Sequence, residues 1–366
     1  MASAARSLSE ILGQPKAVGI LRAAIASGRV HHAWVFVGPM GVGKLTTALA
    51  FAGAILDPTT APDLSGTPEP DPSSPTQRLL ASGTHPDLHV ITKELARYSD
   101  DKEVRSRKLL TIPKQVIDEH LLTPIALTPT LRAGGLASKV FIVDEAERLD
   151  RSRSNAPTQN SMLKTLEEPP DGSVIILVTS AEEALLPTIR SRCQRVVFSS
   201  LDERSMRSWL DASEIRASPE EARWLVRFAD GSPGRLALAH EGGMYEWGRA
   251  IDPMLDEVDR GRFPPELGAT MAKLVDEWAA GVVKKSPQAS KEAANLAGAR
   301  AMLTLLLERC RASLRAAAAV GGDPSRALHA IECVERAEQH IAANVTLRNA
   351  MENLAVQWSS GGDGPG

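Results

Sequence analysis

The feature that most constrains the fold of this chain is a glycine-rich loop that begins at Gly38. The loop follows the pattern G-x-x-x-x-G-K-[ST] at seven of its eight positions, with Leu45 where a hydroxyl is expected. An apolar run, residues 33–37, precedes it, and an Ala/Leu-rich stretch, Thr46 to Leu56, follows it. This context predicts the strand, loop and helix that the motif requires before it can be interpreted as a phosphate site. The predicted phosphate-binding residues are Gly38, Gly41, Gly43 and Lys44, whose backbone N–H groups and ammonium would face phosphate oxygens at a helix N-terminus. The alternative is a glycine-rich turn without a ligand.

Leu45 decides what such a loop can do with a nucleotide. The missing hydroxyl is the group that would ligate Mg²⁺, and an isobutyl side chain cannot replace it. We therefore expect ATP or ADP with Mg²⁺ to bind weakly, through backbone amides and Lys44, and hydrolysis to be slow or absent. Thr46 stands one position later and would reach the metal only if the helix began one residue further on.

Composition excludes several classes of protein. The formal net charge of the 366 residues is −3, whereas chains that bind nucleic acid through their bulk charge are usually basic. The three cysteines, Cys193, Cys310 and Cys333, lack C-x-x-C spacing, so neither a disulfide framework nor a four-cysteine zinc site is expected. No apolar run is long enough to span a membrane, and the N-terminus lacks a signal-peptide core. We expect a cytoplasmic protein.

The order of the predicted elements indicates an α/β fold. Apolar runs at 88–91, 139–144, 174–179 and 195–198 have strand character, and helical segments separate them. Such alternation predicts a parallel sheet that is covered by helices on both faces. After Ser200 the pattern is helical throughout.

Length and pattern together predict three parts and a tail. Residues 1–199 would form the nucleotide-binding domain, 200–253 a small helical lid, and 254–358 a C-terminal helical bundle, with 359–366 disordered by composition. Residues 57–75 contain six prolines and are expected to form an inserted loop without helix or strand. The polar stretch from Ser99 to Lys108 is expected to be a second loop.

Acidic and hydroxyl side chains follow two of the predicted strands. Asp144 and Glu145 end the strand at 139–144, about a hundred residues after the glycine-rich loop. At this place an acidic pair would hold Mg²⁺ and polarise the attacking water; the alternative is a pair of solvated acids. Thr179 and Ser180 end the next strand, where a hydroxyl would contact a terminal phosphate or cap the following helix.

Two arginines are further candidates. Arg235 begins a helix in the predicted lid and would reach a phosphate from that side. Arg192, in Ser191-Arg192-Cys193, precedes the last strand and lies across the sheet from its own glycine-rich loop. It would neutralise charge on a transferred phosphoryl group only in a neighbouring subunit. The alternative is an exposed arginine at a helix end.

With these residues assembled, the chain resembles the bacterial DNA polymerase III clamp-loader subunits of the AAA+ class, and among them the delta-prime type. The similarity extends over residues 8–240. The segments that carry it are Ile11-Leu12-Gly13-Gln14, His32 to Pro39, Thr84-His85-Pro86-Asp87-Leu88, Val140 to Glu147, Asn160 to Pro170, and Ser191-Arg192-Cys193.

The resemblance implies a role in DNA replication. Five such subunits open a sliding clamp and load it on primer-template DNA, and the delta-prime type is a fixed wall that offers its arginine, here Arg192, to the adjacent ATPase. It implies gamma/tau and delta subunits as partners and a collar role for the C-terminal helices. Many relatives carry four zinc-binding cysteines where this chain has residues 57–75, so no zinc is expected. An ATP-hydrolysing gamma/tau-type subunit, or an unrelated phosphoryl-transfer enzyme, are the alternatives.

Overall fold

The computed structural model describes residues 7–63, 66–106, 111–131, 134–149, 156–285, 291–343 and 345–360. The chain folds into two compact units. The first comprises the residues up to Ser213 together with Asp230–Gly234, and the second comprises Glu214–Ala229 and the residues from Arg235 onward. These limits differ from the predicted boundaries at 199/200 and 253/254. The division into a nucleotide-binding domain, a lid and a C-terminal bundle stays a prediction.

A five-stranded parallel sheet forms the centre of the first unit, in the order β4-β5-β6-β1-β7. Its strands are β1 (Ala33–Val37), β4 (Leu88–Ile91), β5 (Lys139–Val143), β6 (Ser173–Thr179) and β7 (Gln194–Val197). Every residue of the three central strands is buried, as expected for a sheet with helices on both faces. The predicted α/β fold class is therefore confirmed.

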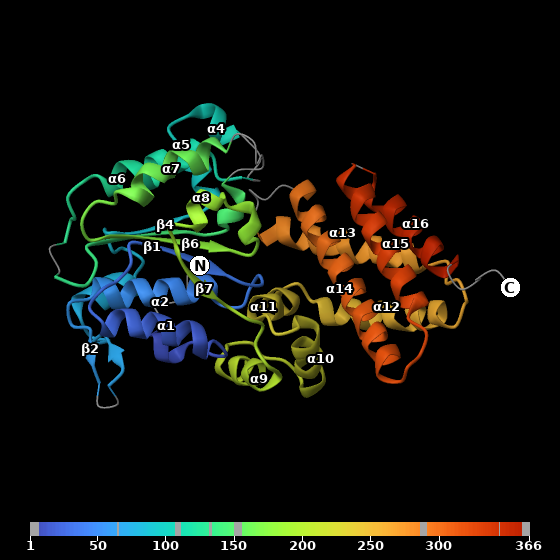
Figure 1. Ribbon diagram of the computed structural model, residues 1–366. Helices are drawn as coiled ribbons and strands as arrows, with labels where there is room; N and C mark the ends of the chain where they lie inside the picture. The colour runs from blue at the N-terminus through green and yellow to red at the C-terminus, as the bar shows by residue number, and fades with distance from the viewer. Residues whose placement is uncertain are drawn as a thin grey trace. The chain divides into compact units, whose positions relative to one another are not determined.

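Helices cover both faces of this sheet (Figure 1). On one face α2 packs its Phe51 edge-on against Trp34 of β1, at 5.3 Å between ring centroids. On the other face Phe141 and the alternate residues of β1 and β6 pack with Met162 and Leu166. The helices of this unit are α1 (Pro15–Ala26), α2 (Lys44–Leu56), α3 (Pro75–Ala81), α4 (Lys102–Ser106), α5 (Lys114–Ile117), α6 (Thr123–Ile125), α7 (Pro157–Glu167), α8 (Pro187–Arg190) and α9 (Glu203–Ala212).

The proline-rich insertion has more structure than the sequence predicts. Within 57–75 the short strands β2 (Ala61–Pro62) and β3 (Pro68–Glu69) pair antiparallel. The buried carboxylate of Asp57 accepts hydrogen bonds from the Thr59 N–H at 2.9 Å and from Ser74 Oγ at 2.5 Å. These bonds tie the two ends of the insertion together, and a two-residue antiparallel pair forms between them. The expectation that this segment contains no strand was therefore wrong.

The prediction of a second loop at 99–108 was also wrong in part. Residues 102–106 form α4, and residues 107 and 108 lie outside the described residues. Val104 is fully buried and anchors this otherwise polar turn in the core. The guanidinium of Arg105 donates to the Ser99 carbonyl at 2.6 Å. One apolar residue in a charged segment is too weak a periodic signal to predict a helix.

The second unit is helical in all its described elements. They are α10 (Pro219–Ala229), the body of α11 (Pro233–Glu241), α12 (Met244–Asp259), α13 (Leu267–Lys285), α14 (Lys291–Ala319), α15 (Ser325–Ala342) and α16 (Leu347–Ser360). Along α14, Leu303, Leu306 and Cys310 are buried at helical spacing. Of the predicted tail, Ser359 and Ser360 complete α16, and residues 361–366 lie outside the described residues.

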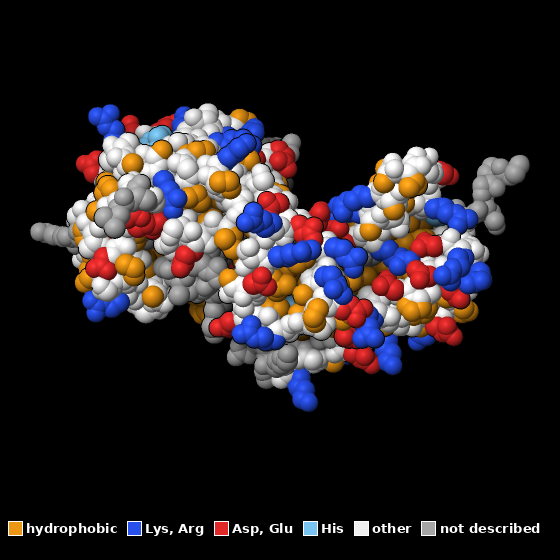
Figure 2. All heavy atoms as spheres, turned by 90° about the horizontal axis from the view of Figure 1, so that it is seen from below, with side chains coloured by type: hydrophobic (Ala, Val, Ile, Leu, Met, Phe, Trp, Pro, Cys, Tyr) orange, Lys and Arg blue, Asp and Glu red, His pale blue; other side chains and the backbone are white. Residues whose placement is uncertain are grey.

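Charge at the surface is mixed. On the face seen in Figure 2, Lys and Arg side chains are interspersed with Asp and Glu side chains, as expected for a chain of net charge −3. None of the described helices is both long and apolar enough to cross a bilayer.

Two histidines in the first unit predict sensitivity to mild acid. Burial lowers the pKa of both His85 and His89, and neighbouring Lys139 lowers that of His89 further. Below about pH 6.5 the unfolded chain binds protons at these imidazoles, whereas the folded chain keeps them neutral to lower pH. The two histidines therefore make folding less favourable as the pH falls below about 6.5. We expect the free energy of unfolding to fall between pH 7 and pH 5 in urea titrations.

The controls are substitutions by glutamine. His85→Gln and His89→Gln together should flatten this pH dependence, whereas His31→Gln, at an exposed position, should leave it unchanged. An equal slope in wild type and the double variant would show that these histidines are not responsible.

Candidate functional site

The glycine-rich loop connects β1 to α2, as predicted, and forms one wall of a pocket of about 480 Å³ in the first unit. Gly43 has φ of 97°, a left-handed conformation that favours glycine. At Gly38 a Cβ atom would lie 2.4 Å from the Phe198 carbonyl oxygen, so only glycine fits between the loop and the end of β7. The pocket is lined by Glu10, Ile11, Leu12, Met40, Gly41, Val42, Gly43, Lys44, Leu45, Thr46, Asp144, Glu145, Glu147, Val178, Thr179, Ser180, Leu201, Trp209, Pro233 and Gly234.

Lys44 is turned back onto its own loop. Its ammonium donates to the carbonyl oxygens of Gly38 and Pro39, at 2.6 Å each. Burial lowers the pKa of Lys44, and the negative charges of Glu147 and Asp144 oppose this effect. A phosphate in the pocket would have to compete with two carbonyl oxygens for this ammonium.

Two segments distant in sequence hold the loop in place. Gln14 is buried and donates from Nε2 to the Ser199 carbonyl at 2.7 Å and to the Val42 carbonyl at 3.3 Å. On the other side, Ser232 Oγ donates to the Met40 carbonyl and the Gly234 N–H to the Gly41 carbonyl, at 2.9 Å each. Sequence patterns did not single out Ser232 and Gly234. Their hydrogen bonds to the loop connect residues 230–234 to the first unit.

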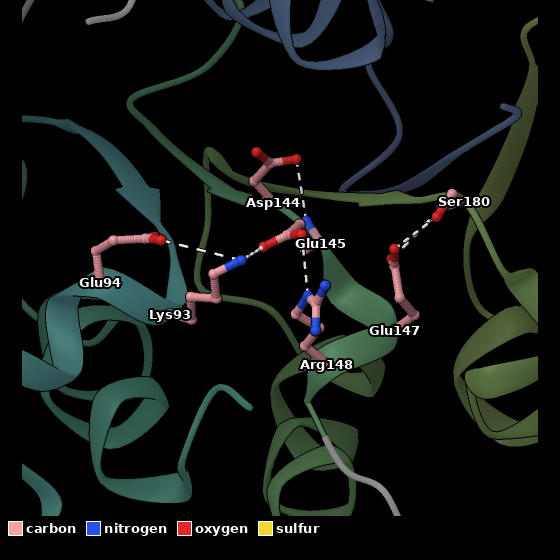
Figure 3. Close-up of polar contacts among 7 residues, drawn as sticks. All are labelled: Lys93, Glu94, Asp144, Glu145, Glu147, Arg148 and Ser180. Atoms are coloured by element: carbon pink, nitrogen blue, oxygen red, sulfur yellow. Dashed lines mark hydrogen bonds and ion pairs between the residues drawn. The ribbon is translucent and has the colours of Figure 1, made fainter. Parts of the chain in front are cut away.

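The two acids that follow β5 have different surroundings (Figure 3). Asp144 faces the loop, and burial raises the pKa of its carboxyl group. Glu145, in a left-handed conformation with φ of 49°, lies between two cations: Lys93 Nζ at 2.5 Å and Arg148 Nε at 2.9 Å. Burial acts to raise the pKa of Glu145, but the bonds from these cations outweigh it and hold the pKa below its usual value.

Glu147 is a site residue that the sequence reasoning did not select. It lies two residues beyond Glu145 and lines the pocket, where its carboxylate accepts from Ser180 Oγ at 2.6 Å and from the Ser180 N–H at 3.3 Å. Ser180, predicted as a phosphate contact, is thus already engaged by an acid. Thr179 Oγ1 accepts from the Ala181 N–H at 3.1 Å, a bond within the turn, and the 3₁₀ helix Glu182–Ala184 that follows has no side-chain cap.

The predicted residues gather only in part. Gly41, Gly43, Lys44, Thr46, Asp144, Glu145 and Ser180 line one pocket. Arg235 belongs to the second unit, where its guanidinium pairs with Glu308 at 2.9 Å. The backbone and Lys44 fit a phosphate group, whereas Leu45 adds no oxygen toward Mg²⁺.

Arg192 lies at the amino edge of the parallel sheet, because it precedes the first residue of β7. The pocket lies at the carboxyl edge, where the loop follows β1. The Arg192 guanidinium pairs with Glu167 at the end of α7 and donates to the Thr188 carbonyl at 2.8 Å. Burial raises the pKa of the adjacent Cys193 thiol to about 12, so it is no nucleophile at neutral pH.

A family model described as DNA polymerase III, delta subunit, matches residues 13–202. The chain belongs to this family of clamp-loader subunits. It is 30% identical over 232 residues to "DNA polymerase III subunit delta'" of Bacillus subtilis, an alignment that spans 63% of this chain and 60% of that relative. It is also 30% identical over 206 residues to "DNA polymerase III subunit gamma/tau" of Mycobacterium bovis, across 56% of this chain and 30% of that relative.

The alignments thus span less than two thirds of these relatives. Among solved structures, a DNA polymerase III gamma subunit-related protein of Thermotoga maritima matches with a TM-score of 0.46 and 15% identity, over 93% of this chain and 98% of that one.

We predict that the chain holds no zinc. Cys193, Cys310 and Cys333 are distributed over both units, and among the described residues no group of three or more His, Cys, Asp or Glu side chains is placed to hold a metal ion. Metal analysis of protein purified without metal affinity should find only traces. About one equivalent of tightly bound zinc per chain would contradict the prediction.

Proposed function

We propose that this chain is a delta-prime-like subunit of the bacterial sliding-clamp loader. It acts as a stator that presents Arg192 to the ATP of a neighbouring subunit. The observation that carries the proposal is the position of Arg192 at the edge of the sheet opposite the chain's own pocket. A guanidinium there can stabilise charge on a transferred phosphoryl group only when another subunit supplies that group.

Slow hydrolysis in the chain's own pocket is the second part of the proposal. Leu45 removes a metal ligand, and Glu145, the candidate for polarising water, is held by Lys93 and Arg148. A carboxylate with two cationic partners is a poor proton acceptor because both favour its charged form. Weak binding of ATP or ADP would remain through the loop backbone and Lys44.

The partners follow from the family. We propose that the chain assembles with gamma/tau and delta subunits, and that it meets the sliding clamp and primer-template DNA through that complex. The helices of residues 254–358 would form the collar that joins the subunits, and 200–253 the lid. Arg235, now paired with Glu308, would contact phosphate from the lid only after leaving that carboxylate.

The alternative is an ATP-hydrolysing gamma/tau-type subunit. The glycine-rich loop, Gly38 to Lys44, and Asp144 favour this alternative. Asp144 and residues 40–44 of the loop line the pocket. Thr46 also lines the pocket and offers a hydroxyl one position after Leu45. The same identity of 30% to both kinds of relative gives neither an advantage.

The two alternatives differ in steady-state ATP turnover. We expect the purified chain to release phosphate well below about 1 s⁻¹, at the low end for enzymes. Leu45→Thr should raise Mg²⁺-dependent ATP binding by about tenfold, because it restores an oxygen ligand. Wild-type turnover at or above that rate, abolished by Lys44→Ala, would favour the gamma/tau type.

Hydrolysis should need a second change. In the Leu45→Thr background, Lys93→Ala removes one cation from Glu145 and should raise turnover above that of Leu45→Thr alone. The matched control is Lys114→Ala, which removes a solvent-exposed i,i+4 pair with Asp118. Equal turnover with and without Lys93 would remove Glu145 from the proposal.

Arg192→Ala tests the stator function in a reconstituted loader with wild-type partners. Arginines supplied in trans contribute about 10³–10⁵ in rate in well-studied nucleotide hydrolases. Other sites keep their own arginines, so only a share of the stimulated ATPase should be lost, while assembly persists and clamp loading falls. Arg195→Ala, which breaks the exposed pair with Glu182, should change neither. Unchanged hydrolysis and loading in Arg192→Ala would make Arg192 an ordinary surface residue.

A further inference from the structure

Glu147 occupies the polar groups of Ser180 that a terminal phosphate would use. Its two carboxylate oxygens accept from the Ser180 hydroxyl at 2.6 Å and from the Ser180 N–H at 3.3 Å. Figure 3 shows these two contacts side by side, away from the cluster of Lys93, Glu145 and Arg148. Glu147 comes from the short 3₁₀ turn Ala146–Arg148, and Ser180 follows β6, so neighbouring strand ends bring them together.

The charge of Glu147 is not balanced as that of Glu145 is. Glu145 has two ion pairs, whereas Glu147 has none with the residues that the structure describes. Burial lowers the pKa of Lys44, and the negative charges of Glu147 and Asp144 act on Lys44 to raise it. Two carboxylates and one ammonium thus line the same pocket, and the ammonium is itself bonded to carbonyl oxygens.

We propose that Glu147 is a specificity-determining residue of this pocket, which makes it discriminate against a nucleoside triphosphate and in favour of the diphosphate. The inference rests on the proposal that the pocket takes a nucleotide. The first two phosphates of a nucleotide lie against the backbone of a glycine-rich loop. The terminal phosphate adds negative charge beside Glu147 and competes with it for Ser180, and like charges at short range oppose each other. Selection for the diphosphate would suit a subunit whose task is to stay in one conformation.

The test compares ATP and ADP binding to the full chain by titration calorimetry in the presence of Mg²⁺. Glu147→Gln keeps the shape of the side chain and removes its charge. It should raise ATP affinity by about tenfold, or about 1.4 kcal/mol, and change ADP affinity by less than about threefold. Glu147→Asp keeps the charge and should keep most of the preference for ADP. Glu183→Gln, which removes the same charge from an exposed residue outside the pocket lining, should leave the ratio of the two affinities unchanged.

A double-mutant cycle with Ser180→Ala supplies a second measure. Because Glu147 acts partly by holding Ser180, the gain in ATP affinity from Glu147→Gln should shrink in the Ser180→Ala background. An unchanged ratio of ATP to ADP affinity in Glu147→Gln overturns the proposal, and so does the absence of measurable binding of either nucleotide to wild type and variants. Both outcomes leave the stator function of Arg192 intact, since that is measured in the assembled loader. Loss of the Arg192 effect would, in turn, leave the affinity ratio unaffected.

Discussion

The parallel direction of the five strands is the constraint on which the rest of this molecule depends. Since every strand runs the same way, whatever follows a strand gathers at one edge of the sheet and whatever precedes a strand gathers at the other. The glycine-rich loop, Asp144 and Ser180 meet at the carboxyl edge. Glu167 and Arg192 meet at the amino edge. A single chain therefore separates this pocket from Arg192, and the trans role proposed for Arg192 requires a neighbouring copy of the fold.

Three acids within one turn of each other show how partners determine chemistry. Asp144, Glu145 and Glu147 follow the same strand and are all carboxylates, but burial raises the pKa of the first and two cations lower that of the second. Glu147 accepts from Ser180 instead. Among these three acids, Glu147 is thus the one that already bonds the hydroxyl and N–H of Ser180, the groups a terminal phosphate would need. In the proposed role, the acid at that position works against triphosphate binding.

Sequence periodicity predicted the sheet well because its three central strands, β5, β6 and β1, are mainly apolar runs that are buried throughout, as in a sheet covered on both faces. The limits of β4 were predicted to the residue, and β5 through β7 to within one residue at each end. The prediction from periodicity failed in two segments where single residues, one polar and one apolar, order the chain. The hairpin within 57–75 depends on the Asp57 carboxylate, and α4 depends on the burial of Val104. Neither effect leaves a periodic pattern, so composition alone favoured loops.

The site was predictable in its residues but not in their partners. Motif spacing located Lys44, Asp144 and Ser180 because the chemistry of phosphate binding fixes their positions along the chain. It could not show that Lys44 donates to its own loop, because motif spacing does not fix the direction of a flexible side chain. It could not show that Ser232 and Gly234 donate to the loop carbonyls, because those contacts join segments that are far apart in sequence. These contacts hold the loop from both sides. A loop whose ammonium and carbonyl oxygens already have internal partners has less to gain from a phosphate, which supports the proposal that this fold serves as a rigid part of an assembly.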